Sequence, residues 1–153
     1  MKHLAALVCA ALLAACATTA PRETDFSACN AYAPAFEITD AFMASFNRED
    51  VAGHEGTLHF PHVRIASGQV LTVPDRGTDW MARAYARLHE QGWHHSAWAD
   101  RRIVQCGPLK AHMLTTFVRY REDGSELSRF DSLYVIEFKE GYWGVTARSS
   151  FAE

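Results

Sequence analysis

Two histidines and an arginine lie in one short stretch, LHFPHVRIASG, which runs from residue 58 to residue 68. The imidazole of His59 or His62 titrates near neutral pH and could act as a general base, and the planar guanidinium of Arg64 could hold an anionic ligand. In an extended chain His62 and Arg64 share one face and His59 lies on the other. The alternative is that His62 and Arg64 are solvated and that His59 caps a turn, in which case none of them takes part in chemistry.

Other kinds of chemistry have little support in the sequence. The segment HEGTLH spaces His54 and His59 five residues apart with a glycine between them, whereas a zinc-binding helix spaces its histidines by four. No glycine-rich phosphate loop is present, and no small-residue elbow surrounds Ser67 or Ser132. We therefore expect neither a metal nor another cofactor.

Two helices are predicted from the spacing of apolar residues. Residues 34–50 place Phe36, Phe42, Met43 and Phe46 toward one side. Residues 78–92 contain a second helical stripe that begins at a cap candidate, Thr78 or Asp79, and ends at Gly92.

Strands are predicted for most of the remaining chain. Residues 62–73 form two apolar runs around Ser67 and Gly68, which is typical of a hairpin. Four longer segments follow, rich in β-branched and aromatic residues, and short turns join three of them in succession; they span 93–107, 110–123, 128–140 and 142–151. This order predicts an α+β fold with an antiparallel sheet and helices packed on one of its faces.

The order of elements resembles the nuclear-transport-factor-like superfamily, which includes ketosteroid isomerase-like and SnoaL-like proteins. The segments that carry the resemblance are FEITDAFMASFNRED, LHFPHVRIASG, WMARAYARLHEQGWHHS and FDSLYVIEFKEGYWGV. The resemblance implies a cone-shaped, curved antiparallel sheet wrapped around helices, with a pocket at the wide end, in a domain spanning residues 34–153. Members of the superfamily include enzymes and binding proteins, so the fold does not decide the function.

The catalytic groups of ketosteroid isomerase do not carry over to this sequence. That enzyme uses an aspartate base and an oxyanion hole formed by a tyrosine and a protonated aspartate. Residues 34–50 contain no tyrosine, and the HFPH segment, which takes the place of the base, contains no acid. Asp131 remains a candidate acid on a cavity strand, where it would assist His59 or His62.

Aromatic and polar side chains of the helix and sheet suggest a small-molecule site. The residues that we expect to bind a ligand are Arg64, Trp80, Trp98, Arg119 and Tyr134, with Arg148 as a further polar candidate. The alternative for each aromatic residue is ordinary core packing. Both faces of the strand at 128–140 are partly apolar, so the face turned away from the interior could contact a helix or form a homodimer.

The N-terminal segment MKHLAALVCAALLAAC resembles a bacterial lipoprotein signal. A positive start precedes an apolar run that is too short to span a bilayer, and small residues precede Cys16. The resemblance implies cleavage after residue 15, acylation of Cys16 and, because Ala17 replaces a retaining aspartate, anchoring to the outer membrane facing the periplasm. A plain secretory signal that is cut near Ala20 is the alternative.

The residues after the signal limit the partners and the redox chemistry. Residues 16–33 lack periodicity and are expected to form a flexible tether. Cys29 and Cys106 could form a disulfide in an oxidising compartment, or could remain as thiols. With a net charge of −3 the chain is not basic enough to suggest that it binds nucleic acid. The same charge predicts no strongly basic surface that would attract a membrane, so attachment to a membrane would come from the lipid.

The expected function is that of a lipid-anchored cell-envelope domain with a pocket for a small apolar or amphipathic ligand, without catalysis. The alternative is an isomerase, cyclase or dehydratase that uses His59 or His62 as its base. A histidine and a carboxylate that converge in an enclosed pocket would favour the enzyme.

Overall fold

The structure is a computed structural model and describes residues 24–66, 68–77 and 79–152. Its first helix, α1 (Tyr32–Asn47), buries Ala35, Thr39 and Phe42 at the spacing expected of a helix. Pro34 lies in the first turn, where backbone N–H groups have no partner within the helix. The helix therefore begins two residues before the predicted start and ends three residues before the predicted end.

Asp50 separates α1 from a short second helix, α2 (Val51–Gly56). The backbone N–H of Gly53 donates a hydrogen bond of 2.9 Å to Asp50 Oδ1, so that Asp50 caps α2. The third helix, α3 (Trp80–Glu90), begins after Asp79 and buries Trp80, Met81, Tyr85 and Leu88. Gly92 follows α3 with a φ of 81°, which other residues rarely adopt.

Six strands form a single sheet in the order β2-β1-β6-β5-β4-β3. The predicted hairpin is confirmed: β1 (Leu58–Ala66) pairs antiparallel with β2 (Gln69–Val73) across a turn that contains Gly68. The meander is also confirmed; it consists of β3 (His95–Cys106), β4 (Lys110–Tyr120), β5 (Glu126–Lys139) and β6 (Tyr142–Ser150).

One strand pair departs from the antiparallel pattern. β1 pairs with β6 in parallel, and the pairing is irregular between Leu58 and Val63. A parallel pair needs a long connection, which α3 and the meander supply here. The sheet is therefore mixed, and the last strand of the chain joins the early hairpin to the meander.

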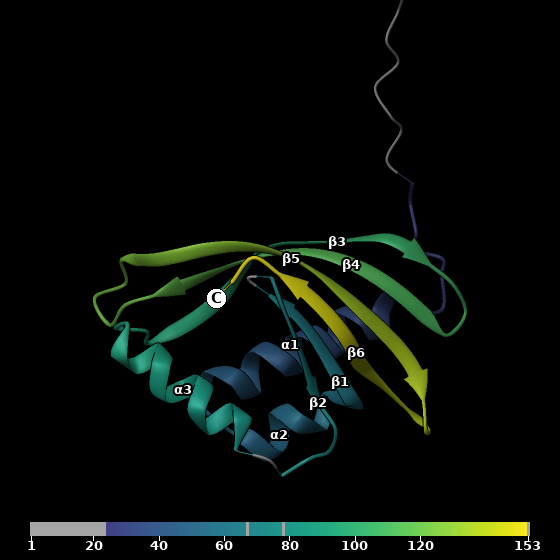
Figure 1. The fold of residues 1–153 in the computed structure, drawn as a ribbon. Helices are drawn as coiled ribbons and strands as arrows, with labels where there is room; N and C mark the ends of the chain where they lie inside the picture. The colour runs from purple at the N-terminus through teal and green to yellow at the C-terminus, as the bar shows by residue number, and fades with distance from the viewer. Residues whose placement is uncertain (1–23, 67, 78, 153) are drawn as a thin grey trace, which may run out of the picture.

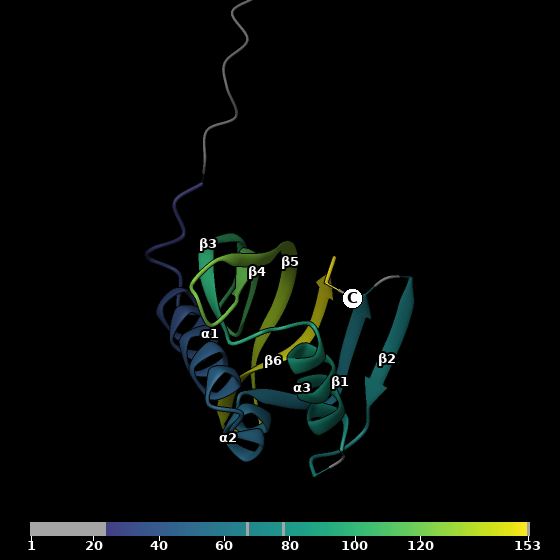
Figure 2. The same cartoon turned by 90° about the vertical axis from the view of Figure 1, so that its left-hand side faces the viewer.

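The sheet bends over the three helices, as Figures 1 and 2 show from two directions. α1 contacts β3, β4 and β6, and α2 contacts α1 and β1. The core lies between the helices and the concave face of the sheet, with Phe42, Met81, Met113, Tyr134 and Ile136 almost completely buried. The sheet stays open along its two edge strands, β2 and β3.

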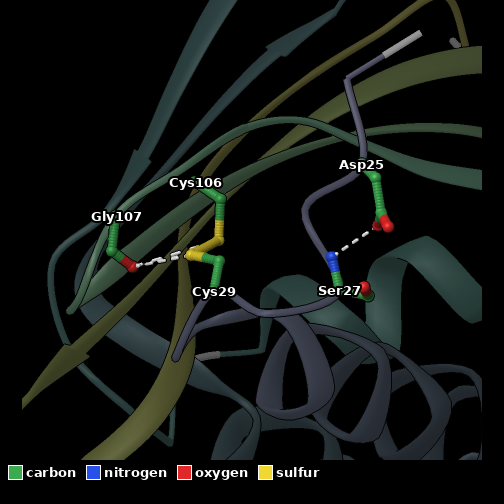
Figure 3. Close-up of a disulfide and its surroundings, with 5 residues drawn as sticks. All are labelled: Asp25, Ser27, Cys29, Cys106 and Gly107. Carbon is green, nitrogen blue, oxygen red and sulfur yellow. Dashed lines mark hydrogen bonds between the residues drawn. A yellow bond between two sulfur atoms is a disulfide. The ribbon is translucent and has the colours of Figure 1, made fainter.

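The segment before α1 is attached to the domain. A disulfide joins Cys29 to Cys106, the last residue of β3, with the two Cα atoms 6.3 Å apart (Figure 3). Cys29 and Phe26 pack against the core. Of the tether predicted for residues 16–33, the described part from residue 24 onward is therefore held against the sheet, and the domain begins before residue 34.

Across residues 24–66, 68–77 and 79–152, no helix has both the length and the apolar character needed to cross a membrane. The signal sequence and Cys16 lie outside the described residues.

Candidate functional site

A cavity of about 500 Å³ lies between the concave face of the sheet, α1 and α3. Its size is within the range typical of small-molecule sites. About half of the lining residues are apolar, and they include Phe42, Phe46, Trp80, Met81, Leu88 and Phe117. The cavity is therefore both large enough and apolar enough to hold a hydrocarbon or aromatic group.

The sheet register places a row of polar side chains across the floor of this cavity. Arg64 on β1 is the register partner of Arg148 on β6, and Arg148 is the partner of Tyr134 on β5. Register partners present their side chains on the same face of a sheet. Three residues that are far apart in the sequence therefore line one surface, and all three contact the cavity.

The arginines of the sheet contact backbone and aromatic groups, and in two of them a buried guanidinium nitrogen has no partner. Arg64 Nη2 donates to the carbonyl oxygen of Ala152 at 2.8 Å. Arg148 lies over the ring of Phe42 with its Cζ 5.2 Å from the centroid, and Arg119 lies over Phe130 at 5.0 Å. The Nε atoms of Arg119 and Arg148 are buried and have no hydrogen-bond partner.

The electrostatics of the cavity are positive. Burial, followed by the charges of Arg148 and Arg119, lowers the pKa of Arg64 to about 10. Burial and the charge of Arg148 also lower the pKa of Arg119. Arginine side chains in proteins carry a positive charge at neutral pH, and no aspartate or glutamate is among the described residues that line the cavity.

Further arginines lie at the mouth of the cavity, on α3. Arg83 and Arg87 are exposed and contribute to the lining. Arg83 is paired with Asp79, one turn earlier, at the exposed end of the helix. A positive entrance in front of a positive interior raises the local concentration of anions and steers them inward.

His62 is buried beside the cavity and is not among the residues that line it. Its Nδ1 donates to the carbonyl oxygen of Val145 at 3.2 Å, and its ring stacks on Trp80 with the centroids 6.3 Å apart. Burial, followed by the charge of Arg148, lowers the pKa of His62 to about 3. The His62 side chain is therefore neutral at physiological pH and is a weak base.

A second buried histidine, His54, has the same character. It lies on α2 with its ring 4.2 Å from that of Phe42, and burial followed by the Arg148 charge lowers its pKa to about 3. Both histidines leave their Nε2 atoms buried and without a partner. The positive charge of the site therefore comes from arginine alone.

The other two candidates for catalysis lie away from the cavity. His59 is buried against Gly144 and the ring of Tyr142, and its Nε2 donates to the carbonyl oxygen of Glu137 at 3.0 Å. Asp131 is exposed, where its Oδ1 accepts a hydrogen bond of 2.7 Å from Thr116. The structure does not bring His59, His62 and Asp131 together, because none of them lines the cavity.

The expected ligand-binding residues are placed more favourably. Arg64, Trp80, Arg119 and Tyr134 line the cavity, whereas Trp98 packs on Phe42 and Tyr134 behind it and donates to the carbonyl oxygen of Thr39 at 3.2 Å. The expectation did not include the α1 aromatic residues or Arg87. The spacing of Phe42 and Phe46 on one helix face was a usable signal, but it could not separate cavity lining from core packing.

Metal binding has no support in the described part of the chain, where no three histidine, cysteine, aspartate or glutamate side chains are grouped closely enough to hold an ion. The lining of the cavity offers apolar contacts and the N–H donors of arginine side chains. Proton abstraction would need a base on the cavity surface, and the nearest histidines are neutral, buried and engaged with backbone carbonyls.

Solved structures with the same fold come from several bacteria. A protein of unknown function with a cystatin-like fold from Nostoc punctiforme has a TM-score of 0.64 and 16% identity, covering 80% of this chain and 90% of that chain. An NTF2-like protein from Cytophaga hutchinsonii has a TM-score of 0.60 and 18% identity, covering 81% and 99%. A ketosteroid isomerase-like protein from Erwinia carotovora atroseptica has a TM-score of 0.58 and 17% identity, covering 79% and 95%.

At these identities the likeness shows the fold alone. No curated protein matches this chain. A family model described as NTF2-like protein (DUF6841) matches residues 34–151, which is most of the chain and nearly the whole of the expected domain. The chain therefore belongs to this NTF2-like family, and the predicted nuclear-transport-factor-like fold is confirmed.

Proposed function

We propose that this protein is a lipid-anchored domain of the cell envelope that binds a small apolar or amphipathic ligand and does not catalyse a reaction on it. The observation that supports the proposal is the cavity between α1, α3 and the sheet, which combines a volume of about 500 Å³ with aromatic and aliphatic walls. Sites of this shape bury most of the surface of a small ligand.

The arrangement of titratable groups argues against catalysis. A general base has to come within hydrogen-bond reach of the proton it removes and has to be unprotonated but basic at the working pH. His62 meets neither condition, because it does not line the cavity and its pKa lies at about 3. His59 and Asp131 are held elsewhere by contacts with Glu137 and Thr116.

The proposed location is supported by two independent features. The first is the lipoprotein-like segment that ends at Cys16. The second is the disulfide between Cys29 and Cys106, since disulfides persist in oxidising compartments such as the periplasm. Attachment through a lipid on Cys16 would leave the domain facing the periplasm.

Binding is tested with a neutral amphiphile. The purified protein is titrated with decanol while tryptophan fluorescence is followed, because Trp80 lines the cavity. We expect saturable binding that is lost in Ala84→Trp, which places a large side chain in the cavity, and kept in Ala82→Trp, which changes an exposed residue of the same helix outside the lining. Circular dichroism establishes that both variants fold. Equal loss in both variants, or no saturation in the native protein, would contradict the proposal.

Anchoring is tested separately. The full chain is expressed in a Gram-negative bacterium, and the envelope is separated into inner and outer membranes. We expect the protein in the outer membrane with acyl chains detectable by mass spectrometry, and we expect Cys16→Ser to abolish acylation and release the protein. An acylation-free native protein that is soluble in the periplasm would show that the signal is a plain secretory one.

A further inference from the structure

We propose that the ligand of this cavity is an amphipathic anion, whose oxyanion head is bound by Arg64, Arg148 and Arg119 and whose apolar part lies against Phe42 and Trp80. This inference rests on the proposed binding function and specifies its ligand class. The candidate ligands share a compact head group whose negative charge is spread over two or more oxygen atoms, as in a carboxylate or a phosphate monoester.

The first argument is the pairing of like charges. Arg64 and Arg148 are register partners on neighbouring strands, and like charges directly opposite each other destabilise a sheet. Both are removed in part from water, which would otherwise screen the repulsion, and the charge of Arg148 lowers the pKa of Arg64 and of Arg119. An anion between them converts this repulsion into two attractive interactions.

The second argument is unsatisfied hydrogen-bonding capacity. Arg119 is only 9% exposed, and its Nε has no partner; the Nε of Arg148 is also buried without a partner. Buried polar groups are nearly always hydrogen-bonded, so each exception requires an explanation. An oxyanion that enters the cavity is the partner that a guanidinium prefers, because its donors match two oxygen atoms at once.

The third argument is the composition of the lining. Arginine residues from β1, β4, β6 and α3 line the cavity, and no acidic residue within the described segments lines it with them. His54 and His62 lie next to Arg148 as neutral rings, so they do not compensate for the charge either. Most of the remaining lining is apolar, so an inorganic anion alone would leave most of the cavity surface without a ligand contact.

The experiment compares ligands that share a tail and differ in the head. Decanoate, decyl phosphate, decanol and decylamine are titrated below their micelle concentrations, with binding followed by tryptophan fluorescence and calorimetry. We expect at least one of the two anions to bind about ten-fold or more tightly than decanol, since a hydrogen bond to a charged group contributes about 1.5–3 kcal/mol. We expect decylamine to bind more weakly than decanol.

Variants assign the selectivity to the arginines. Arg64→Gln and Arg148→Gln should each remove most of the preference for the anion, so that in each variant the affinities for the anion and for decanol differ by less than about three-fold. Arg102→Gln removes an exposed cation outside the cavity and should change neither affinity. Glu153 is an acid and directly follows Ala152, whose carbonyl oxygen accepts a hydrogen bond from Arg64. The series is therefore repeated with Glu153→Gln, and the same selectivity is expected.

The outcomes separate the two proposals. If decanol binds as tightly as both anions, or if the arginine variants keep the preference, this inference is wrong and the binding function stands. If none of the four amphiphiles saturates the protein, the binding function itself fails. Of the two anions, a tighter decanoate identifies a carboxylate head and a tighter decyl phosphate identifies a phosphate head, and either result supports the inference.

Discussion

Arg64 on β1 and Arg148 on β6 are direct register partners, although they are more than eighty residues apart in the sequence. They meet because β1 and β6 form the parallel pair of an otherwise antiparallel sheet, and both side chains line the same cavity. Two cations are thereby placed side by side in a partly buried site. Like charges directly opposite each other on neighbouring strands destabilise a sheet, and the proposed anion would offset this repulsion.

Replacing Arg148 should therefore raise the stability of the ligand-free protein. Arg148→Met removes the charge opposite Arg64, together with the contact between the guanidinium and the ring of Phe42, and leaves a shorter, unbranched apolar side chain. We expect the free energy of unfolding to rise by about 0.5–1 kcal/mol, the scale of a cross-strand pair, measured by urea denaturation at neutral pH.

The control for this prediction is Arg102→Met, which removes an exposed cation on β3 and should change the unfolding free energy by less than about 0.5 kcal/mol. A loss of stability in Arg148→Met that is greater than the loss in Arg102→Met would show that Arg148 has a structural role, and the charge repulsion argued here would then not be the dominant effect.

The two buried histidines should make the protein unstable in weak acid. The pKa of His54 and of His62 falls from 6.5 in the unfolded chain to about 3 in the folded protein. The unfolded state therefore binds more protons between these values, so the stabilisation is complete above pH 6.5 and is lost as the pH falls toward 3. At about pH 5 each histidine should lower the free energy of unfolding by about 2 kcal/mol.

Urea denaturation at several pH values measures this dependence. In His62→Asn the side-chain amide can still donate to the Val145 carbonyl, but the titratable group is absent, so the dependence on pH should become about half as steep. His89→Asn is the control for an exposed histidine, whose Nε2 contacts Glu49 Oε1 at 2.8 Å, and it should alter the slope less than His62→Asn does. A slope that His62→Asn does not alter would argue against a neutral, buried His62.

Reducing the disulfide should destabilise the domain. The bridge between Cys29 and Cys106 closes a loop across 77 residues of the chain, which lowers the entropy of the unfolded state. Removing a native disulfide from a small domain typically costs about 2–5 kcal/mol, and the long loop places this bridge toward the upper end of that range. The double variant Cys29→Ser/Cys106→Ser should show the loss in urea denaturation, and a reducing agent should produce the same loss in the native protein and none in the variant.

Gly144 should not tolerate a side chain, because β6 passes close to His59 at this residue. A Cβ added to Gly144 would lie 2.9 Å from the ring of His59. Overpacking of this kind typically costs about 1–3 kcal/mol, so we expect Gly144→Ala to lower the free energy of unfolding by that amount. Gly107→Ala, where the nearest atom would be 3.9 Å away, should cost less than about 0.5 kcal/mol.

The contact with His59 is tested by a double-mutant cycle. His59→Ala removes the ring that the new methyl group would meet. In that background, Gly144→Ala should therefore lower the free energy of unfolding by about 1 kcal/mol less than it does in the native protein. Independent, additive effects of the two substitutions would mean that the cost at Gly144 has another source.

Much of the fold could be predicted because the signals are local. The spacing of Phe42 and Phe46 predicts the helix that the structure shows, and Ser67-Gly68 predicts the turn of the β1–β2 hairpin. Turn residues and β-branched residues likewise mark the strands of the meander. These features depend on residues within a few positions of one another, so the sequence alone determines them.

The orientation of the histidines could not be predicted, because it depends on how β1 is paired. Alternation along a regular strand would put His59 and His62 on opposite faces. The irregularity between Leu58 and Val63 breaks that alternation, and both rings become buried. A bulge of this kind is set by the partner strand and has no reliable local signature.

The sequence by itself therefore determined the elements, their order and the superfamily, and it singled out Arg64, Arg119 and Tyr134, which line the cavity. Only the tertiary structure decided that Arg64 faces Arg148, that the candidate base and acid lie apart, and that several arginine side chains line one cavity. The physical reason is that charge repulsion, burial and convergence on a cavity are properties of pairs of residues, and those pairs form only when β1 meets β6 across the folded sheet.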